Sequence, residues 1–224
     1  MGPKDVKISG NVISIRLMDE SYVMCEDERK EGVVVDVECR FMSPRWPNPL
    51  YSAYYRKILK AYGVGPVLAW QGRRIVGFLP VIVPGCSIPE LPLCVHYTGG
   101  SGYGAEKHID LAMIENTVEI PFDELNCKEI KIGCMSVHRN MRGRNLAASM
   151  IQYMADWARG NDWNQMRARV MLDGEPQAFY PTSSWWMGLG FKTIGTGRSF
   201  GPTKSAIDRS KAVDLMLDLR EYDT

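Results

Sequence analysis

Long hydrophobic runs are missing from the sequence. No stretch approaches the roughly 18 consecutive apolar residues of a membrane-spanning helix, so we expect no membrane partner. The first residues also lack the charged and then apolar pattern of a secretory leader. Gly2 follows Met1, but Val6 stands where a myristoylation motif needs Ser or Thr. We therefore expect a cytoplasmic protein without a lipid anchor.

Closely paired cysteines are missing as well. The six cysteines are Cys25, Cys39, Cys86, Cys94, Cys127 and Cys134. None forms a C-x-x-C pair, which favours reduced thiols in a cytosolic protein over a disulfide framework. Cys86 and Cys94 share a segment with His96 and His108, but structural zinc sites favour closely spaced pairs. We expect no metal site.

An excess of either charge is the third absence. The chain has 27 basic and 26 acidic residues, a formal net charge of +1, which argues against nucleic acid as a partner. Any anion site must therefore be local. The 224 residues are 45% hydrophobic, enough to supply a core. This length fits one large domain or two small ones, and the chain has no internal repeat and no low-complexity linker.

The amino-terminal half predicts a strand, a helix and a hairpin. Apolar residues at helical spacing follow the proline-rich stretch Pro44–Pro49 and stop at Gly63. Pro80 indicates a bulge or a sheet edge within the hairpin. The predicted strands are Val12–Leu17, Val67–Trp70 and Ile75–Val83, with a turn at Gln71-Gly72 between the last two.

The carboxy-terminal half has the most regular pattern. Glu129–Val137 is rich in strand-forming residues, helical spacing then continues to Gly160, and Met166–Leu172 alternates apolar residues with arginines. This order predicts a β-α-β unit with two parallel strands. A short helix at Ser183–Leu189, a strand from Phe191 and a strand at Val213–Leu219 should follow. The fold class is therefore mixed α/β with a mixed sheet.

A basic corner lies where the first strand of this unit meets its helix. The first amides of a helix lack intrahelical partners and carry the positive end of the helix dipole. Gly143 lets a ligand approach the backbone, while Arg142 and Arg144 add donors and charge. The corner is therefore a candidate phosphate site. The alternative is a solvated helix start.

Three motifs in order resemble the GNAT superfamily of acyl-CoA N-acyltransferases, over most of the chain. The segment from Arg142 to Ala147 stands where the family has Arg/Gln-x-x-Gly-x-Gly/Ala, with Asn145 in place of the first motif glycine. Trp186–Phe191 is similar to the family's aromatic-x-x-x-Gly-Phe signature. Ile75–Phe78 ends in the Val-Gly-Phe of the family's third strand.

The resemblance implies a single domain over residues 1–224 with an atypical insertion at about 84–128. It implies a central mixed sheet with flanking helices and a V-shaped split between two parallel strands. It implies acetyl-CoA as co-substrate, with its pantetheine arm paired to backbone in the split and its pyrophosphate at the helix start. The coenzyme-binding residues so implied are Met135, Val137, Arg142, Gly143, Arg144, Asn145, Leu146 and Ala147. The implied reaction is transfer of an acyl group, most simply acetyl, to an amine of a small molecule or a peptide.

Attack by an amine asks for a base and favours an acid for the leaving thiolate. Glu129 matches the position of the base glutamate in histone acetyltransferases of the superfamily; the alternative is a solvated carboxylate beside Lys128 and Lys131. Trp186 stands where many members of the superfamily place a tyrosine that acts as the general acid. An indole cannot supply that proton. Tyr180 is the nearest substitute, or else a packed aromatic.

Other functions stay open on the sequence. Gly100, Gly102 and Ala105 fit the dinucleotide pattern G-x-G-x-x-A, but prolines interrupt the strand that this fingerprint needs. They lie in the segment 84–128, which is longer than the family's turn and is expected to shape the acceptor site. The Asn145 and Trp186 departures also suit a non-enzymatic module that binds acyl-CoA or a partner. A homo-oligomer is compatible with all of these.

Overall fold

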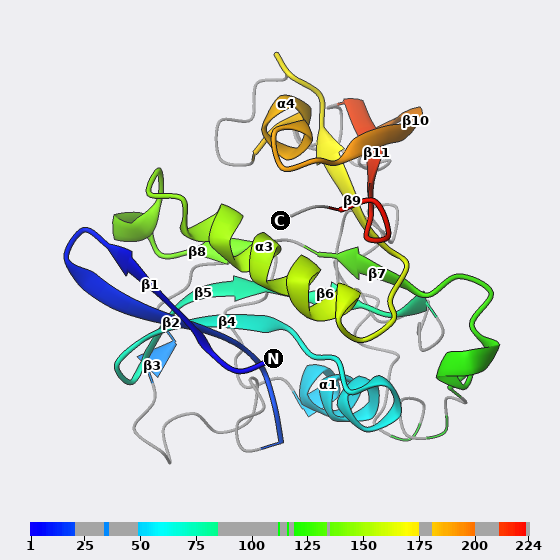
Figure 1. The fold of residues 1–224 in the computed structure, drawn as a ribbon, viewed down its shortest axis with the longest axis horizontal. Coiled ribbons are helices and arrows are strands. Elements are labelled where there is room, and N and C mark those ends of the chain that lie inside the picture. The colour runs from blue at the N-terminus through cyan, green and yellow to red at the C-terminus, as the bar shows by residue number, and fades with distance from the viewer. Residues whose placement is uncertain are drawn as a thin grey trace.

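A computed structural model describes residues 1–20, 34–35, 49–84, 112, 116, 119–133, 135–174, 181–199 and 211–222. These residues form two β-sheets with helices packed on them (Figure 1). The strands are β1 (Lys4–Ile8), β2 (Asn11–Leu17), β3 (Val34–Val35), β4 (Val67–Gln71), β5 (Arg74–Leu79), β6 (Val81–Ile82), β7 (Glu129–Ile132), β8 (Ser136–Val137), β9 (Gln165–Met171), β10 (Lys192–Ser199) and β11 (Lys211–Asp218). The α-helices are α1 (Pro49–Tyr62), α3 (Leu146–Arg159) and α4 (Ser183–Met187).

The two sheets mix parallel and antiparallel pairs, as the sequence predicts. The first has the order β1-β2-β4-β5-β3, with β8 also paired to β5. The second has the order β10-β11-β9-β7-β6. Strands β7 and β9 are parallel across α3, while β11 is antiparallel to both β9 and β10. The predicted β-α-β unit is therefore confirmed.

Helices α1 and α3 cover opposite faces of the first sheet. Phe78 of β5 packs edge-on against Tyr55 of α1, with ring centroids 6.4 Å apart. The neighbouring Gly77 points the other way, because successive strand residues face opposite sides. A Cβ at Gly77 would lie 2.7 Å from Met150 Sδ of α3, so the glycine lets this helix approach closely. The Val-Gly-Phe motif thus has a packing reason.

The end of α1 and the turn of the β4–β5 hairpin lie where the sequence predicts them. Gly63 has a φ of +63° and its amide bonds the carbonyl of Leu59, which closes α1 where the apolar spacing stops. Gly72 turns the chain between β4 and β5 with a φ of +58°. Strand β1, by contrast, is not predicted. Its sequence KDVKI alternates charged and apolar residues over only five positions, too short a signal to stand alone.

The chain changes sheets at two facing points. Pro80 separates β5 of the first sheet from β6 of the second, so the predicted strand Ile75–Val83 is two strands. On the neighbouring strand, Gly133 begins the break between β7 of the second sheet and β8 of the first. Pro80 therefore marks a change of sheet, whereas the bulge of the hairpin lies at Ala69/Trp70.

The end of the segment 84–128 is fixed to α1. Lys57 of α1 forms a 3.2 Å ion pair with Glu119, and Tyr62 donates a 2.9 Å hydrogen bond to the carbonyl of Ile120. Phe122 packs against Trp163, just before β9, with ring centroids 5.1 Å apart. Most of the predicted insertion lies outside the described residues. Of the helices that are described, none has the length and apolar character to cross a membrane.

Candidate acyl-coenzyme site

The corner before α3 has a backbone that suits an anion. Gly143 has a φ of +68°, and Asn145 is left-handed with φ 62° and ψ 7°. Asn is among the few residues that tolerate this region, so Asn145 supplies the backbone shape that a glycine would otherwise give. The Asn145 side chain makes no capping hydrogen bond to the helix. The first amides of α3, from Leu146 and Ala147 on, are thus not capped by that side chain.

The turn before α3 is both open and basic, which suits an anion. A Cβ placed at Gly143 would have no other atom within 4 Å, so the loop is open there. Arg142 and Arg144 are exposed beside it. Arg142 Nε donates a 3.1 Å hydrogen bond to the carbonyl of Val137, which ties the loop to the end of β8. The residues predicted to hold a pyrophosphate are therefore gathered in one open, basic turn.

The end of β8 presents backbone groups to the side away from β5. Gly77 and Val137 are opposite each other in this antiparallel pair, and the His138 amide bonds the carbonyl of Val76. Because bonded and non-bonded pairs alternate along such a ladder, the N–H and C=O of Val137 point away from β5. They face the side on which β7 meets β9. Met135, half-buried, packs on the core just before.

The parallel pairing of β7 and β9 is short. It runs from Glu129 opposite Gln165 to Ile132 opposite Ala168. Beyond these pairs β8 bonds to β5, whereas β9 continues beside β11 as far as Met171. The chain after β7 thus joins the first sheet as β8 while β9 stays in the second, at the place where the resemblance implies a V-shaped split. The width of such an opening stays a prediction.

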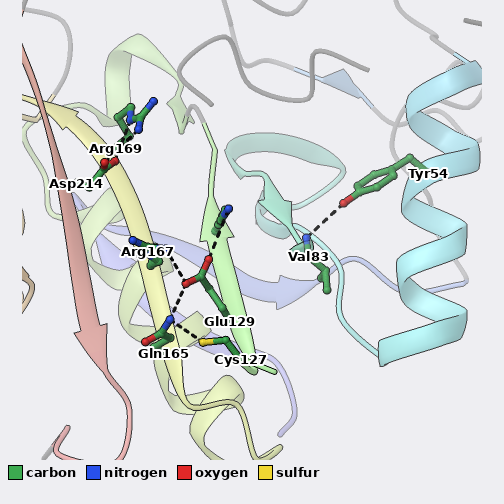
Figure 2. A network of polar contacts seen from close by, with 9 residues as sticks. Tyr54, Val83, Cys127, Glu129, Gln165, Arg167, Arg169 and Asp214 are labelled. Carbon is green, nitrogen blue, oxygen red and sulfur yellow. Dashed lines mark hydrogen bonds and ion pairs between the residues drawn. The ribbon is translucent and has the colours of Figure 1, made fainter. Parts of the chain in front are cut away.

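Glu129 is buried at the closed end of this arrangement. Its side chain is only 6% exposed, and Oε2 accepts hydrogen bonds from Gln165 Nε2 and, at 3.2 Å, from Arg167 (Figure 2). Oε1 lies 3.6 Å from Lys131 Nζ. The predicted alternative was a solvated carboxylate beside Lys128 and Lys131. Its contact with Lys131 is confirmed, but the carboxylate is buried, and Lys128 instead lies over the Phe122 ring and pairs with Asp123. Glu129 as a base stays a prediction.

A second ion pair lies on the same sheet, one row further along β9. Arg169 bonds Asp214 of β11 with both prongs of its guanidinium, Nε to Oδ1 at 2.8 Å and Nη2 to Oδ2 at 3.0 Å. The hydrogen bond from Arg169 keeps the pKa of Asp214 below its ordinary value, against the opposing effect of partial burial. Sequence reasoning missed this pair, although the alternating Arg167 and Arg169 were visible as one polar face of a strand.

Comparison with known proteins settles the fold. No family model matches the chain, and no curated protein matches it. Among solved structures, yncA from Salmonella typhimurium with its cofactor acetyl-CoA is 12% identical over 95% of this chain and 96% of that one, with a TM-score of 0.52. A spermidine N-acetyltransferase SpeG chimera from Vibrio cholerae and hSSAT is 11% identical over 94% and 97%, at 0.53. A GphF GNAT-like decarboxylase in complex with isobutyryl-CoA is 14% identical over 92% and 99%, at 0.52. The chain has the GNAT fold.

The second motif of the GNAT fold is a packing motif in this chain. Trp186 is 5% exposed and packs edge-on against Trp185 and Phe191, with centroids 5.4 and 5.0 Å away. Gly190 turns the chain between them with a φ of +91°. Trp186 therefore fills the core at this position. The candidate acid Tyr180 lies outside the described residues.

The residues of the other two site types considered from the sequence, a dinucleotide site and a zinc site, lie outside the described residues. They are Gly100, Gly102, Ala105, Cys86, Cys94, His96 and His108. Within the part of the chain that is described, no three His, Cys, Asp or Glu side chains gather as metal ligands. His138 lies at the corner and its Nδ1 accepts a 3.4 Å hydrogen bond from the Asn140 amide, which shapes the turn before α3.

Proposed function

We propose that the protein transfers an acyl group, most simply acetyl, from coenzyme A to an amine. The observation that carries this proposal is the open, basic turn before α3, where Gly143 and Asn145 both adopt left-handed backbone. Such a turn at a helix start suits the two negative phosphates of a coenzyme A diphosphate. The GNAT fold and its neighbours solved with acetyl-CoA and isobutyryl-CoA support the same ligand class.

The strand next to the turn supports the position of the pantetheine arm. Val137 directs its main-chain groups away from β5, and its carbonyl is linked to Arg142. An amide-bearing arm lying along this edge would add main-chain hydrogen bonds as a further strand does. Met135 and Val137 are therefore the proposed contacts, with Arg142 to Ala147 at the diphosphate.

The chemistry itself is an exchange of bonds at one carbonyl carbon. The amine nitrogen forms a bond to the thioester carbon, the carbon–sulfur bond breaks, and coenzyme A leaves as a thiolate that takes up a proton. The amine must lose a proton in the process, and Glu129 is the proposed base, acting directly or through water. Gln165 and Arg167 hold its carboxylate in place. Backbone amides in the split would stabilise charge on the carbonyl oxygen.

A second candidate is an acyl-CoA-binding module without turnover. Two observations favour it. Trp186 is buried at the position where a tyrosine would act as the general acid, and Glu129 is already paired with Arg167 and Lys131. Both leave the coenzyme corner intact while weakening the case for proton transfer. This candidate predicts binding of acyl-CoA but no release of thiol with any amine.

One assay separates these functions. The protein is incubated with acetyl-CoA and a panel of amines that includes neutral, acidic and polyamine acceptors and a peptide amine, and free thiol is followed with time. Thiol release that depends on an amine, matched by an acetylated product in mass spectrometry, supports the transferase. Coenzyme binding without amine-dependent release supports the binding module. Tight binding of a nicotinamide dinucleotide with no coenzyme A binding would contradict both.

A further inference from the structure

The two oxygens of the Glu129 carboxylate have different surroundings. Oε2 accepts hydrogen bonds from Gln165 Nε2 and, at 3.2 Å, from Arg167 Nη1, both from β9 (Figure 2). Oε1 accepts none from a described residue, and its charged neighbour is Lys131 Nζ at 3.6 Å. Two donors therefore hold one oxygen, while the lone pairs of the other stay available for a proton.

Gln165 presents the nitrogen end of its amide to Glu129. The two residues are direct partners in the parallel pairing of β7 and β9. Gln165 Nε2 donates to Glu129 Oε2 and, at 2.8 Å, to Cys127 Sγ, so each of the two amide hydrogens has an acceptor. Turned over, the amide would place its oxygen against the carboxylate, and two acceptors would face each other. The thiol and the carboxylate thus fix the orientation of the amide.

The Cys127 thiol is a neutral acceptor for this amide. Partial burial raises the pKa of the thiol, and the charge of Glu129 raises it further. Arg167, the hydrogen bond from Gln165 and Arg220 act in the opposite direction, but the net shift is upward. The thiol is therefore protonated at neutral pH, and Cys127 adds no second anion beside Glu129.

A further carboxylate lies across the sheet, but it is bound elsewhere. Asp218 of β11 is the partner of Gln165 on its other side. Arg220 donates to both oxygens of Asp218, from Nε to Oδ1 at 2.9 Å and from Nη2 to Oδ2 at 2.6 Å. These hydrogen bonds lower the pKa of Asp218 to about 2, so it stays ionised and paired with Arg220. The Gln165 amide is thus directed to Glu129 and not to Asp218.

We propose that Gln165 is a positioning residue that holds Oε2 of Glu129 and leaves Oε1 as the atom that takes the proton of the acceptor amine, directly or through water. This inference rests on the proposed function and names the atom at which its proton transfer occurs. A hydrogen bond donated to a carboxylate favours the charged form. Gln165 therefore both orients the base and keeps it ready to accept a proton.

Removing the donor should change the pH dependence of turnover. Gln165→Met keeps the length of the side chain but has no hydrogen to donate. With an amine that the thiol assay identifies as an acceptor, the limb of the pH–kcat profile that reports the base should move upward by about one pH unit. On that limb kcat should be about tenfold lower at a given pH. The KM for acetyl-CoA should stay within about twofold. Gln165→Glu, which replaces the donor by a second carboxylate, should move the limb further.

Two control variants locate the effect. Gln71→Met makes the same substitution in the first sheet, where Gln71 donates a 3.0 Å hydrogen bond to Asn11, and should leave the limb unchanged. Cys127→Ala removes the other acceptor of the Gln165 amide and should move the limb upward by less than Gln165→Met does. Unfolding curves establish that the variants are folded. A loss of kcat by one factor at every pH, with the limb in place, would mean a structural role only and would overturn the inference.

A measurement without substrates keeps the inference separate from the proposed function. If no amine releases thiol, the transferase proposal fails. The side-chain carboxyl carbon of Glu129, assigned by its absence in Glu129→Gln, is then followed by NMR as the pH is changed. A titration midpoint about one pH unit higher in Gln165→Met than in the wild type would uphold the control of Glu129 by Gln165. Equal midpoints would overturn it, as would an active transferase whose turnover is unaltered in Glu129→Gln.

Discussion

The main-chain amide of Gly133 donates a 2.8 Å hydrogen bond to the carbonyl of Pro80. Each residue stands where its strand passes from one sheet to the other, so the bond joins the two breaks. A proline has no amide hydrogen to offer a sheet ladder, but its carbonyl still accepts. The contact links the two points at which the chain changes sheets, beside the short pairing of β7 and β9.

The close fit at this contact predicts a stability effect. A Cβ at Gly133 would lie 2.9 Å from Cγ of the Pro80 ring, and the ring has little freedom to move. Gly133→Ala should therefore lower the free energy of unfolding by about 1–3 kcal/mol in urea titrations. Gly195→Ala is the control, because its nearest neighbour would be 3.9 Å away. Equal unfolding midpoints in the two variants would refute the packing argument.

The regular elements of the fold could be predicted because their signals are local. The apolar residues Val213, Leu215, Leu217 and Leu219 alternate along the last strand and are all buried. Gly143, with Arg142 and Arg144 beside it, marks the corner at which α3 begins. The change of sheets was not, because it depends on which distant strands Ser136 and Val81 pair with. No local spacing records that choice.

The candidate site also combines local features that the sequence predicts with contacts that it does not. Asn145 stands where the motif has a glycine, and its left-handed φ of 62° is one that Asn tolerates better than most residues. Of the partners of Glu129, Lys131 was predicted, but Gln165 and Arg167 could not be foreseen, because they reach Glu129 through the register between β7 and β9. Sequence neighbours suggested Lys128, but that side chain lies over the ring of Phe122. Contacts across a sheet need the register, which the sequence does not display.

Acid should reveal the Arg169–Asp214 pair. The folded pKa of Asp214 lies below its ordinary value near 3.8, so the stability it contributes is present above about pH 4. That contribution is lost as the pH falls through the lower, folded pKa. Asp214→Asn should therefore flatten the decline of unfolding free energy below about pH 4. The exposed Asp5→Asn variant should follow the wild type; a wild-type decline in Asp214→Asn as well would contradict the assignment.

The segment 84–128 is predicted to govern the acceptor rather than the coenzyme. Replacing residues 86–116 by a short Gly/Ser linker leaves Val83 and the packed end at Glu119 and Phe122 in place. We expect coenzyme A affinity within about twofold of the wild type and loss of transfer to the native amine. Calorimetry and the thiol assay measure the two. Loss of coenzyme binding in a folded variant would instead assign the segment to the cofactor.

The proposed base gives the clearest kinetic prediction. Glu129→Gln keeps the shape of the side chain but should lower kcat by on the order of a hundredfold, and the limb of the pH–rate profile that reports the base should vanish. Coenzyme affinity should not change. Glu124→Gln, an exposed carboxylate nearby, serves as the control.

Unaltered turnover in Glu129→Gln would mean that another group takes the proton from the acceptor amine. Tyr180→Phe should cost less than about tenfold, because water can protonate a coenzyme A thiolate; a larger loss would make Tyr180 the acid.

The most direct test of coenzyme binding at the start of α3 is a calorimetric titration of coenzyme A into the wild type, Gly143→Glu and Asn145→Gly. The account predicts binding to the wild type and at least about a hundredfold loss in Gly143→Glu, which places a carboxylate in the open turn. Asn145→Gly keeps a residue that accepts the left-handed φ and should bind as tightly as the wild type or more so. Unfolding curves establish that all three are folded. Equal affinity in a folded Gly143→Glu variant would contradict the account and place the diphosphate elsewhere.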